Sequence, residues 1–547
     1  MLVSFEEKPW FQNWPDDVPK HLEYPEVPLF DLLKEVAKKY PAKPAIVYLG
    51  KETTYENLDA LSDRFAAALS NLGIGKGDCV GLYLPNIPQF VVAYYGILKI
   101  GAVLTAISPL CREREVENQL SDSEAKVVVT LDSLFPIVKA VLKKTLLQHV
   151  LLTSIEENPD QPIPKNQVIH SAKISSFHQL ITSTEADLPR VKIDPNNDLA
   201  ALQFTGGTTG KAKAAMLTHR NLLSNALAFA AWIKGNEAHE TFLTALPLFH
   251  IYGMTTSLNV PVSLAAKIVL FPKFDPAKSL EAIQTNKVTV FCGVPAMYQA
   301  LLANPQLGKF DLTSIRVCIS GASPLPQNVQ KKFVRITGGL LAEGYGLTEA
   351  SPVTHCSPVD VTMKTVRVGS IGLPIPDTEA KIVDIETGTK NLSVGEVGEL
   401  AVCGPQVMKG YWRRPEETAQ IFRGDWLLTG DIARMDAEGY FYITDRKKDL
   451  IKYKGYSVYP REIEDILYEH PAVKICAVVG KADDREGEIP KAYVVIKEDH
   501  FATSKEILEF VNEKVAPYKA IREIEFREDL PLSLAGKVLR RSIKDEN

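Results

Sequence analysis

The chain has 547 residues, several times the length of a typical domain and enough to bury more than one hydrophobic core. Apolar residues make up 45% and charged residues 24%, as in ordinary water-soluble globular proteins. The net charge of −5 argues against a nucleic-acid partner, which usually leaves a basic footprint. Seven scattered cysteines, without a CxxC pair or a Cys/His cluster, indicate reduced thiols and a cytoplasmic setting.

The N-terminal segment lacks the basic and apolar regions of a secretory signal, and no window approaches 18 consecutive apolar residues. Trp10, Phe11 and Trp14 leave two alternatives open, contact with a membrane surface or packing on their own domain. Acidic neighbours weaken attraction to anionic lipid and favour packing. Peripheral membrane contact therefore stays open. The formation of a homodimer stays open as well.

From about residue 30 the pattern alternates between helices and strands. We expect helices at 30–40, 54–73 and 89–102, and strands at 44–49, 78–84, 126–131 and 149–153. Continuous apolar strands that alternate with helices predict a parallel sheet covered by helices.

The same pattern returns later in the chain and then changes twice. Strand candidates at 266–271, 288–292, 315–320 and 339–345 predict a second α/β layer. Short strands and frequent glycines from 367 to 443 predict a small antiparallel barrel or sheet. After 445 come a helix, two strands and a Thr503–Glu506 capping box. The fold class is therefore α/β, with a large N-terminal domain over 1–446 and a small, mobile α+β domain over 447–547.

The most informative stretch is TGGTTGKAKAAMLTH at 205–219. Its glycines allow sharp turns and close approach to a ligand, and consecutive backbone N–H groups suit phosphate oxygens. It is not a Walker A loop, because Gly206 and Gly210 are one residue too close and Ala212 replaces the magnesium-binding Ser or Thr. Taken alone, it is either a phosphate loop of another kind or a flexible surface turn.

Four further motifs follow this loop. They are EGYGLTEAS at 343–351, TGDIA at 429–433, DRKKDLIKYKGYSVYPREIE at 445–464 and LAGKVLRR at 534–541. In this order the five motifs resemble the acyl-adenylate-forming superfamily, which includes acyl-CoA synthetases, luciferases and the adenylation domains of peptide synthetases. The resemblance covers essentially the whole chain.

The resemblance implies an ATP-dependent acid–thiol ligase of the fatty acyl-CoA synthetase type. Such an enzyme joins a medium- or long-chain fatty acid to AMP, releases pyrophosphate and passes the acyl group to coenzyme A. ATP, Mg²⁺ and coenzyme A are the implied cofactor and co-substrates. Because the attacked phosphate is densely anionic, catalysis must come mainly from placement and neutralisation of charge.

The resemblance also implies roles for particular residues. Glu349 would hold Mg²⁺, Thr348 would donate to the α-phosphate, and His250 would lie beside the acyl carboxylate. Tyr345 would stack on adenine. The implied nucleotide-binding residues are Thr205, Gly206, Gly207, Thr208, Thr209, Gly210, Lys211, Lys213, Gly321, Ala322, Ser323, Glu343, Gly344, Tyr345, Gly346, Thr348, Asp431 and Arg446.

The C-terminal motifs carry the remaining roles. Asp431 would accept hydrogen bonds from the ribose hydroxyls, and Lys537 would be the catalytic cation of adenylation. Lys448 resembles a hinge, about which the C-terminal domain would rotate to bring in Lys452 and Gly455 for coenzyme A.

Each of these residues also has an ordinary structural explanation. Thr348 and Glu349 suit a helix start, Tyr345 and His250 suit packing, and Asp431 suits a solvated turn. The run 446–454 reads as a basic surface strand, and a lysine such as Lys537 is ordinarily just solvated.

Two departures from the family pattern affect the loop and the C-terminal motif. Ala212 and Ala214 flank Lys213 where the family usually has proline and glycine, and Ala535 replaces a common Ser or Thr. Because alanine disfavours positive φ, we expect a change in loop geometry or reaction rate rather than in reaction type.

Four alternatives to a fatty acyl-CoA synthetase stay open, and one of them is luciferase-like light emission, which shares the motifs. An aryl or aryl-propenoic acid–CoA ligase has the same motifs with a flatter pocket. A carrier-loading adenylation module also shares them. A nucleotide-binding sensor without turnover belongs to a different class, and the charged residues Glu349, Asp431 and Lys537 argue against it.

Overall fold

The computed structural model describes residues 8–156, 173–205, 212–360, 365–454, 456–483, 485–532 and 538–544. The chain divides into two compact units. The larger unit comprises Trp14–Glu379 with Gly404–Gln420, and the smaller comprises Met1–Asn13, Ala380–Cys403 and Ile421–Asn547.

The larger unit contains two sheets. In the described residues, one is seven-stranded, in the order β7 (Ile174–Ser176), β6 (His149–Thr153), β5 (Ala125–Leu131), β3 (Cys79–Tyr83), β4 (Val103–Ala106), β8 (Leu199–Phe204) and β9 (Ala214–Thr218). Every neighbouring pair is parallel except β8 and β9, which form an antiparallel hairpin around the glycine loop. The central strands β3 and β5 are mostly apolar and almost entirely buried, as expected for strands covered on both faces.

The second sheet is nine-stranded in the described part of the chain. Its order is β16 (Leu373–Pro374), β15 (Val353–Cys356), β14 (Leu340–Gly346), β13 (Val317–Ser320), β12 (Val290–Gly293), β10 (Thr241–Thr244), β11 (Lys267–Leu270), β1 (Pro44–Tyr48) and β2 (Lys51–Thr54). The strands from β14 to β1 pair in parallel, and antiparallel strands close both edges. Both predicted α/β layers are therefore confirmed.

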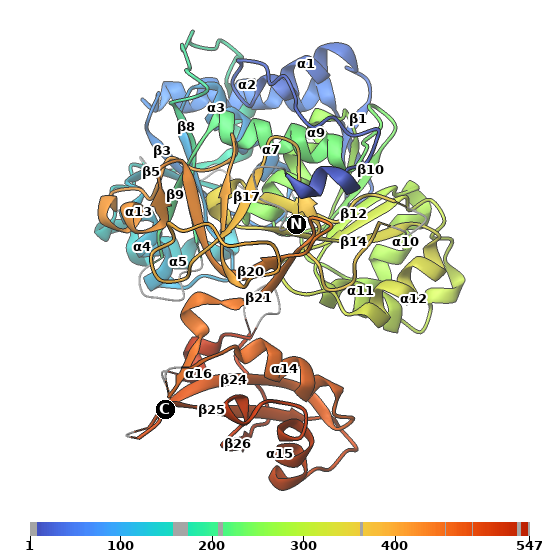
Figure 1. The fold of residues 1–547 in the computed structure, drawn as a ribbon. Helices are drawn as coiled ribbons and strands as arrows, with labels where there is room; N and C mark the ends of the chain where they lie inside the picture. The colour runs from blue at the N-terminus through green and yellow to red at the C-terminus, as the bar shows by residue number, and fades with distance from the viewer. Residues whose placement is uncertain are drawn as a thin grey trace. The chain divides into compact units, whose positions relative to one another are not determined.

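Helices cover these sheets (Figure 1). They are α1 (Asp31–Lys39), α2 (Tyr55–Asn71), α3 (Pro88–Lys99), α4 (Glu113–Asp122), α5 (Phe135–Val141), α6 (Phe177–Ser183), α7 (His219–Trp232), α8 (Ile251–Met254), α9 (Val260–Ser263), α10 (Pro276–Asn286), α11 (Pro295–Ala303), α12 (Gln327–Thr337) and α13 (Pro415–Ile421). Every residue of α3 is buried, as expected for a helix packed on all sides. By contrast, α10, α11 and α12 bury one face each against β12, β13 and β14.

The smaller unit contains two further sheets. The first is antiparallel and consists of β17 (Glu379–Val383), β18 (Gly398–Cys403), β19 (Phe422–Arg423), β20 (Trp426–Met435) and β21 (Phe441–Arg446). It confirms the small antiparallel sheet expected from the short strands and glycines.

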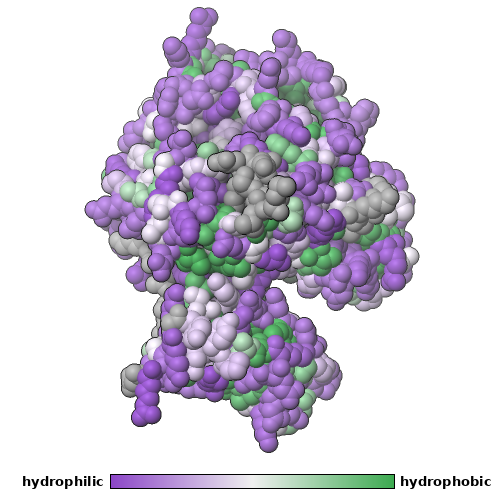
Figure 2. Space-filling model, in the orientation of Figure 1, coloured by the Kyte–Doolittle hydropathy of each residue, from purple (hydrophilic) through white to green (hydrophobic). Residues whose placement is uncertain are grey.

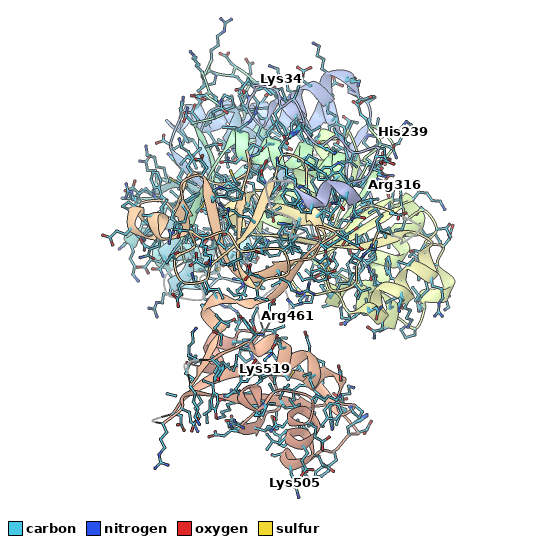
Figure 3. All side chains as sticks on the ribbon, in the orientation of Figure 1. Lys34, His239, Arg316, Arg461, Lys505 and Lys519 are labelled. Atoms are coloured by element: carbon cyan, nitrogen blue, oxygen red, sulfur yellow. The ribbon has the colours of Figure 1, made fainter. Side chains whose placement is uncertain are left out.

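The second sheet of this unit belongs to its α+β part. It consists of β22 (Ile451–Tyr453), β23 (Tyr456–Val458), β24 (Val473–Asp483), β25 (Gly487–Ile496) and β26 (Glu523–Phe526), with helices α14 (Pro460–Glu469), α15 (Ser504–Asn512) and α16 (Arg540–Lys544). Thr503 and Glu506 cap α15 reciprocally, as the sequence predicts. Figure 3 labels Arg461 and Lys519 in this part, where the Lys519 ammonium pairs with Glu462 at 2.5 Å.

The aromatic residues near the N-terminus pack within the protein. Trp10 is 2% exposed and lies against Phe441, and Trp14 stacks edge-on with Trp232. None of the helices in the described part of the chain has the length and apolarity needed to cross a bilayer. The face drawn in Figure 2 is mostly hydrophilic, with hydrophobic residues in small patches. The packing alternative for Trp10 and Trp14 is therefore the one observed.

Candidate functional site

Several predicted site residues of the larger unit follow the carboxyl ends of strands. Thr205 follows β8, His250 lies in the loop after β10, Gly321 follows β13, and Tyr345 lies at the end of β14. In open α/β sheets, ligands bind at this edge because the loops there converge from several strands. The arrangement favours a ligand site built from loops rather than from the strand faces.

The glycine loop connects the two strands of a hairpin. Phe204 pairs with Ala214, and the Thr205 amide donates to the Lys213 carbonyl at 2.8 Å, so the base of the loop is closed. Six predicted phosphate-binding residues lie outside the described part of the chain: Gly206, Gly207, Thr208, Thr209, Gly210 and Lys211.

Ala214, one of the departures from the family pattern, is the first residue of β9 and is 4% exposed. Its carbonyl accepts from the Trp412 amide at 2.8 Å, and in the antiparallel ladder with β8 it pairs with Phe204. Because an extended strand does not need positive φ, alanine is compatible with the backbone at this position.

Thr348 and Glu349 begin the 3₁₀ turn η7 (Thr348–Ala350) directly after β14. The helix-start interpretation of this pair is therefore correct, and it leaves the carboxylate available. The Tyr411 hydroxyl donates to Glu349 Oε1 at 2.6 Å, and the Met408 amide donates to the Glu349 carbonyl at 2.8 Å. Burial, and then the Glu349 charge, raise the pKa of Tyr411, so that its hydroxyl stays a donor.

Tyr345 lies between Gly344 and Gly346 and is partly exposed. Its cross-strand neighbour is His355, with the ring centroids 6.0 Å apart. Burial lowers the pKa of His355 to about 3, so the imidazole beside Tyr345 is neutral. A partly exposed aromatic face between two glycines is accessible to a flat ring.

The segment after β13 approaches a tyrosine that the motifs do not include. A Cβ atom on Gly321 would lie 3.0 Å from the Tyr252 ring, so only glycine fits without displacement. The Tyr252 hydroxyl donates to the carbonyls of Ile319 at 3.0 Å and Gly293 at 3.3 Å. Ala322 and Ser323 continue this loop, and Ala322 is exposed. Tyr252 therefore fills the space between the ends of β12 and β13.

His250 is not a core residue, contrary to its ordinary structural explanation. Its side chain is exposed and caps α8, with Nδ1 accepting from the Tyr252 amide at 3.2 Å. Because Nδ1 accepts, the neutral ring carries its proton on Nε2. Desolvation lowers the pKa of His250, which favours the neutral ring. The neutral ring can donate from Nε2 to a carboxylate.

The helix that His250 begins has an irregular centre. After α8 the chain forms a π-helical turn, η5 (Thr255–Asn259), before α9. Such turns often occur at functional sites, because they change the direction in which side chains point. This element was not predicted from the sequence.

In the smaller unit, Asp431 and Arg446 face each other across β20 and β21. The Arg446 Nε atom lies 2.7 Å from Asp431 Oδ1, and Asp431 is 3% exposed. The solvated-turn interpretation of Asp431 is therefore wrong. A buried carboxylate already paired with an arginine is held in one orientation.

The predicted hinge and coenzyme A residues follow β21. Lys448 is exposed in η8 (Lys447–Asp449), while its neighbour Lys447 pairs with the buried Glu399 at 2.7 Å. Lys452 is exposed on β22 and donates to the Ser457 hydroxyl at 3.0 Å. Gly455 and Lys537 lie outside the described residues.

Glu349 is the carboxylate of the larger unit that the motifs assign to a magnesium ion. No cluster of three potential ligands occurs in the described residues. Among those residues, Glu349 Oε1 is taken by Tyr411 and no side chain or amide donates to Oε2. Mg²⁺ in nucleotide sites typically uses one or two carboxylates plus substrate phosphates, so Glu349 fits.

Comparison with known proteins identifies the family. The AMP-binding enzyme family matches residues 33–412, and its C-terminal domain matches residues 462–537. This chain belongs to the AMP-binding enzyme family.

Full-length relatives agree with this assignment. A long-chain-fatty-acid–CoA ligase of Bacillus subtilis is 43% identical, over 99% of this AMP-binding enzyme and 98% of the relative. A probable 4-coumarate–CoA ligase 1 of Dictyostelium discoideum is 35% identical, over 96% of each chain. Among solved structures, ATP-bound MatB from Rhodopseudomonas palustris matches with a TM-score of 0.84 at 30% identity, covering 94% of this chain and 98% of that one.

Two tyrosines of this AMP-binding enzyme were missed by reasoning from the motifs. Tyr252 is two residues from His250, so its proximity in sequence was a usable signal. Tyr411 is 62 residues from Glu349, and no local pattern connects the two.

Proposed function

We propose that this AMP-binding enzyme activates a medium- or long-chain fatty acid with ATP and transfers the acyl group to coenzyme A. The observation that carries the proposal is the likeness over nearly the full length to a long-chain-fatty-acid–CoA ligase at 43% identity. The placement of Thr348, Glu349, Tyr345 and His250 around the carboxyl ends of β10 and β14 supports it.

Two displacement steps follow from this proposal. First, a carboxylate oxygen of the acid bonds to the α-phosphorus, the bond to the β-phosphate oxygen breaks, and pyrophosphate leaves. Then the sulfur of coenzyme A, after losing its proton, bonds to the acyl carbon, and AMP leaves with the electron pair of the broken C–O bond. In both steps charge accumulates on oxygen, so fixed donors and cations lower the barrier.

The residues of the larger unit take distinct roles in the first step. His250 Nε2–H orients the acid carboxylate, Thr348 donates to the α-phosphate, and Tyr345 stacks on adenine. The glycine loop from Thr205 to Lys213 holds the outer phosphates. Mg²⁺ bound by Glu349 and phosphate oxygens would neutralise charge on the leaving pyrophosphate.

The smaller unit supplies the remaining roles. Asp431, held by Arg446, accepts hydrogen bonds from the ribose, and Lys537 neutralises charge during adenylation. The proposal also includes a domain boundary between 446 and 447, with Lys448 as the hinge. Lys452 and Gly455 would then face coenzyme A. The seven free cysteines support a cytoplasmic setting.

A pyrophosphate-release assay over saturated acids of increasing chain length, with and without coenzyme A, tests the proposal. We expect release with medium- and long-chain acids, and thioester only when coenzyme A is added. Maximal release with 4-coumarate would favour the aryl ligase, which the Dictyostelium relative keeps as the second candidate. ATP binding without release for any acid would leave a nucleotide sensor instead.

The Lys537→Ala variant tests the division of labour within the reaction. We expect it to abolish formation of acyl-AMP from acid and ATP, while largely sparing thioester formation from supplied acyl-AMP. Equal loss in both half-reactions would reject the assignment of Lys537 to adenylation.

Light scattering of the parent protein checks for a homodimer, and its co-sedimentation with vesicles checks for peripheral membrane contact.

A further inference from the structure

The segment that carries Tyr411 is aligned against the strand that follows the glycine loop. The Met216 amide donates to the Gly410 carbonyl at 2.9 Å, and the Trp412 amide donates to the Ala214 carbonyl at 2.8 Å. Ala215 and Tyr411 form an antiparallel bridge between these bonds. The Tyr411 amide also donates to the Thr418 hydroxyl at 2.9 Å. The backbone of Tyr411 is thereby fixed to β9, one of the two strands that the glycine loop connects.

The side chain of Tyr411 connects this hairpin to Glu349. The tyrosine is 8% exposed, and its hydroxyl donates to Glu349 Oε1 at 2.6 Å. From the same segment, the Met408 amide donates to the Glu349 carbonyl. Glu349 is thus held at both its backbone and one carboxylate oxygen, while Oε2 receives no hydrogen bond from any described residue. A carboxylate held by one oxygen presents the other in a defined direction.

The face of the Tyr411 ring holds a second charged group. The Lys213 ammonium lies 5.1 Å from the ring centroid, within the range of a cation–π contact. No described carboxylate lies within ion-pair distance of Lys213. Its positive charge is therefore held by an aromatic ring and is not neutralised by a described acidic side chain. A cation held in this way keeps its attraction for phosphate.

We propose that Tyr411 is a positioning residue that fixes the metal-binding carboxylate Glu349 and the phosphate-binding cation Lys213 on one side chain. Its hydroxyl occupies Glu349 Oε1 and leaves Oε2 for the metal ion, while its ring holds the Lys213 ammonium at the end of the glycine loop. The inference rests on the proposed function, because it takes the ligand to be a metal–ATP complex. Tyr411 itself touches neither the phosphates nor the metal.

The Tyr411→Phe variant separates the two halves of this role, because it removes the hydroxyl and keeps the ring. Mn²⁺, which prefers the same oxygen ligands as Mg²⁺, reports metal binding directly by electron paramagnetic resonance. We expect the affinity of the full-length variant for Mn²⁺–ATP to fall by about tenfold or more, since a hydrogen bond to a charged group is lost. ATP binding in EDTA, measured by calorimetry, should stay within about twofold of the parent protein.

The ring is tested by Tyr411→Leu and by Lys213→Met. Both should weaken ATP binding in EDTA, Lys213→Met because it removes the cation and Tyr411→Leu because it removes the ring that holds the cation in place. Tyr411→Leu should additionally show the loss of Mn²⁺ affinity seen for Tyr411→Phe. If Tyr411→Leu leaves ATP binding in EDTA unchanged while Lys213→Met weakens it, the ring does not hold the lysine and that half of the proposal is wrong.

The matched control is Tyr24→Phe. The Tyr24 hydroxyl donates to Asp377 Oδ2 at 2.8 Å, which is the same tyrosine–carboxylate pairing within the same unit. Tyr24→Phe should leave the affinity for Mn²⁺–ATP unchanged, and it shows what the loss of such a hydrogen bond does to stability alone.

Two results for Tyr411→Phe would overturn the proposal. Equal weakening of ATP binding with and without metal would show a merely structural role, and an unchanged affinity for Mn²⁺–ATP would show that the hydroxyl does not position the metal-binding carboxylate. A parent protein that binds Mn²⁺–ATP but releases no pyrophosphate with any acid would reject the proposed function and leave this inference standing.

Discussion

His219 is a buried histidine whose ring already has a fixed protonation state. It begins α7, has no exposed surface, and its Nδ1 accepts from the Leu29 amide at 3.2 Å. Burial lowers the pKa of His219 from 6.5 to about 4, so the folded protein keeps the ring neutral at physiological pH. Protonation at Nδ1 would remove the acceptor and place an uncompensated charge in the interior.

This histidine makes stability depend on pH in one direction. The unfolded chain gains a proton on the ring near pH 6.5, whereas the folded chain gains it only near pH 4. Between those values the unfolded state binds more protons, so stability falls as pH falls. We expect the parent protein to lose about 3 kcal/mol relative to His219→Gln on going from neutral pH to about pH 4. Urea unfolding of both proteins across this range measures the difference, and parallel curves would contradict the expectation.

At the scale of elements, an arginine joins three segments of the smaller unit. Arg540, the first residue of α16, donates to Asp445 at the end of β21 at 2.9 Å and to Asp449 in η8 at 3.0 Å. It also pairs through two nitrogens with Glu464 of α14. All of these groups are largely buried, so the arrangement is stable only while charges balance.

Removing the arginine should therefore be costly. We expect Arg540→Met to destabilise the smaller unit by about 3–5 kcal/mol, because buried carboxylates lose their counter-charge. Adding Glu464→Gln to Arg540→Met should recover part of this loss, since one uncompensated charge is removed. Hydrogen exchange of amides in α14 and β24 measures both variants. Additive effects of the two substitutions would show that the charges do not interact.

The elements that the sequence predicted correctly are those with local signals. Periodicity located α2, α3 and α14, and the Thr503–Glu506 spacing located the start of α15. The π-helical turn η5 and the alignment of Gly410 with β9 were not predicted. They depend on contacts between distant segments, which no local spacing records.

The same division applies to the candidate site. Motif residues such as Glu349 and Tyr345 were located by short contiguous patterns that a single loop must present. Their partners come from other segments, His355 from β15 and Tyr411 from a residue bridged to β9, and these contacts arise only when the segments have come together. A solvated turn was the alternative explanation for Asp431, but the strand β20 continues through this residue and buries it.

At the scale of the whole molecule, the N-terminal segment and the small antiparallel sheet form one structure. The 3₁₀ helix η2 (Pro9–Asn13) lies against the turn between β20 and β21, where the side-chain Nδ2 of Asn13 donates to the Glu438 carbonyl at 2.9 Å. A Cβ atom on Gly439 would lie 2.2 Å from the Trp10 backbone nitrogen, so the two segments touch at backbone distance. This pairing joins residues more than 400 positions apart, a separation at which sequence patterns carry no information.

Trp10 is the residue that makes this long-range contact hydrophobic. It is 2% exposed and its ring centroid lies 6.1 Å from that of Phe441. We expect Trp10→Ala to lower the free energy of unfolding of the smaller unit by about 3–5 kcal/mol, the usual cost of removing a buried tryptophan. Calorimetry measures this, with Phe11→Ala as the control, because Phe11 is only partly buried and should cost less.

The same pair of variants decides between the two roles considered for the N-terminal aromatic residues. A side chain that is already buried has no surface to insert into lipid, so Trp10→Ala should not change co-sedimentation with vesicles of phosphatidylcholine and phosphatidylglycerol. If Trp10→Ala instead weakened vesicle binding and left the unfolding transition unchanged, the tryptophan would have to leave its site against Phe441 to meet the membrane. The Trp10 ring is removed from water both in its site against Phe441 and in lipid. Moving it into the membrane is therefore unfavourable unless its burial in lipid compensates for the whole energy of the lost contact with Phe441.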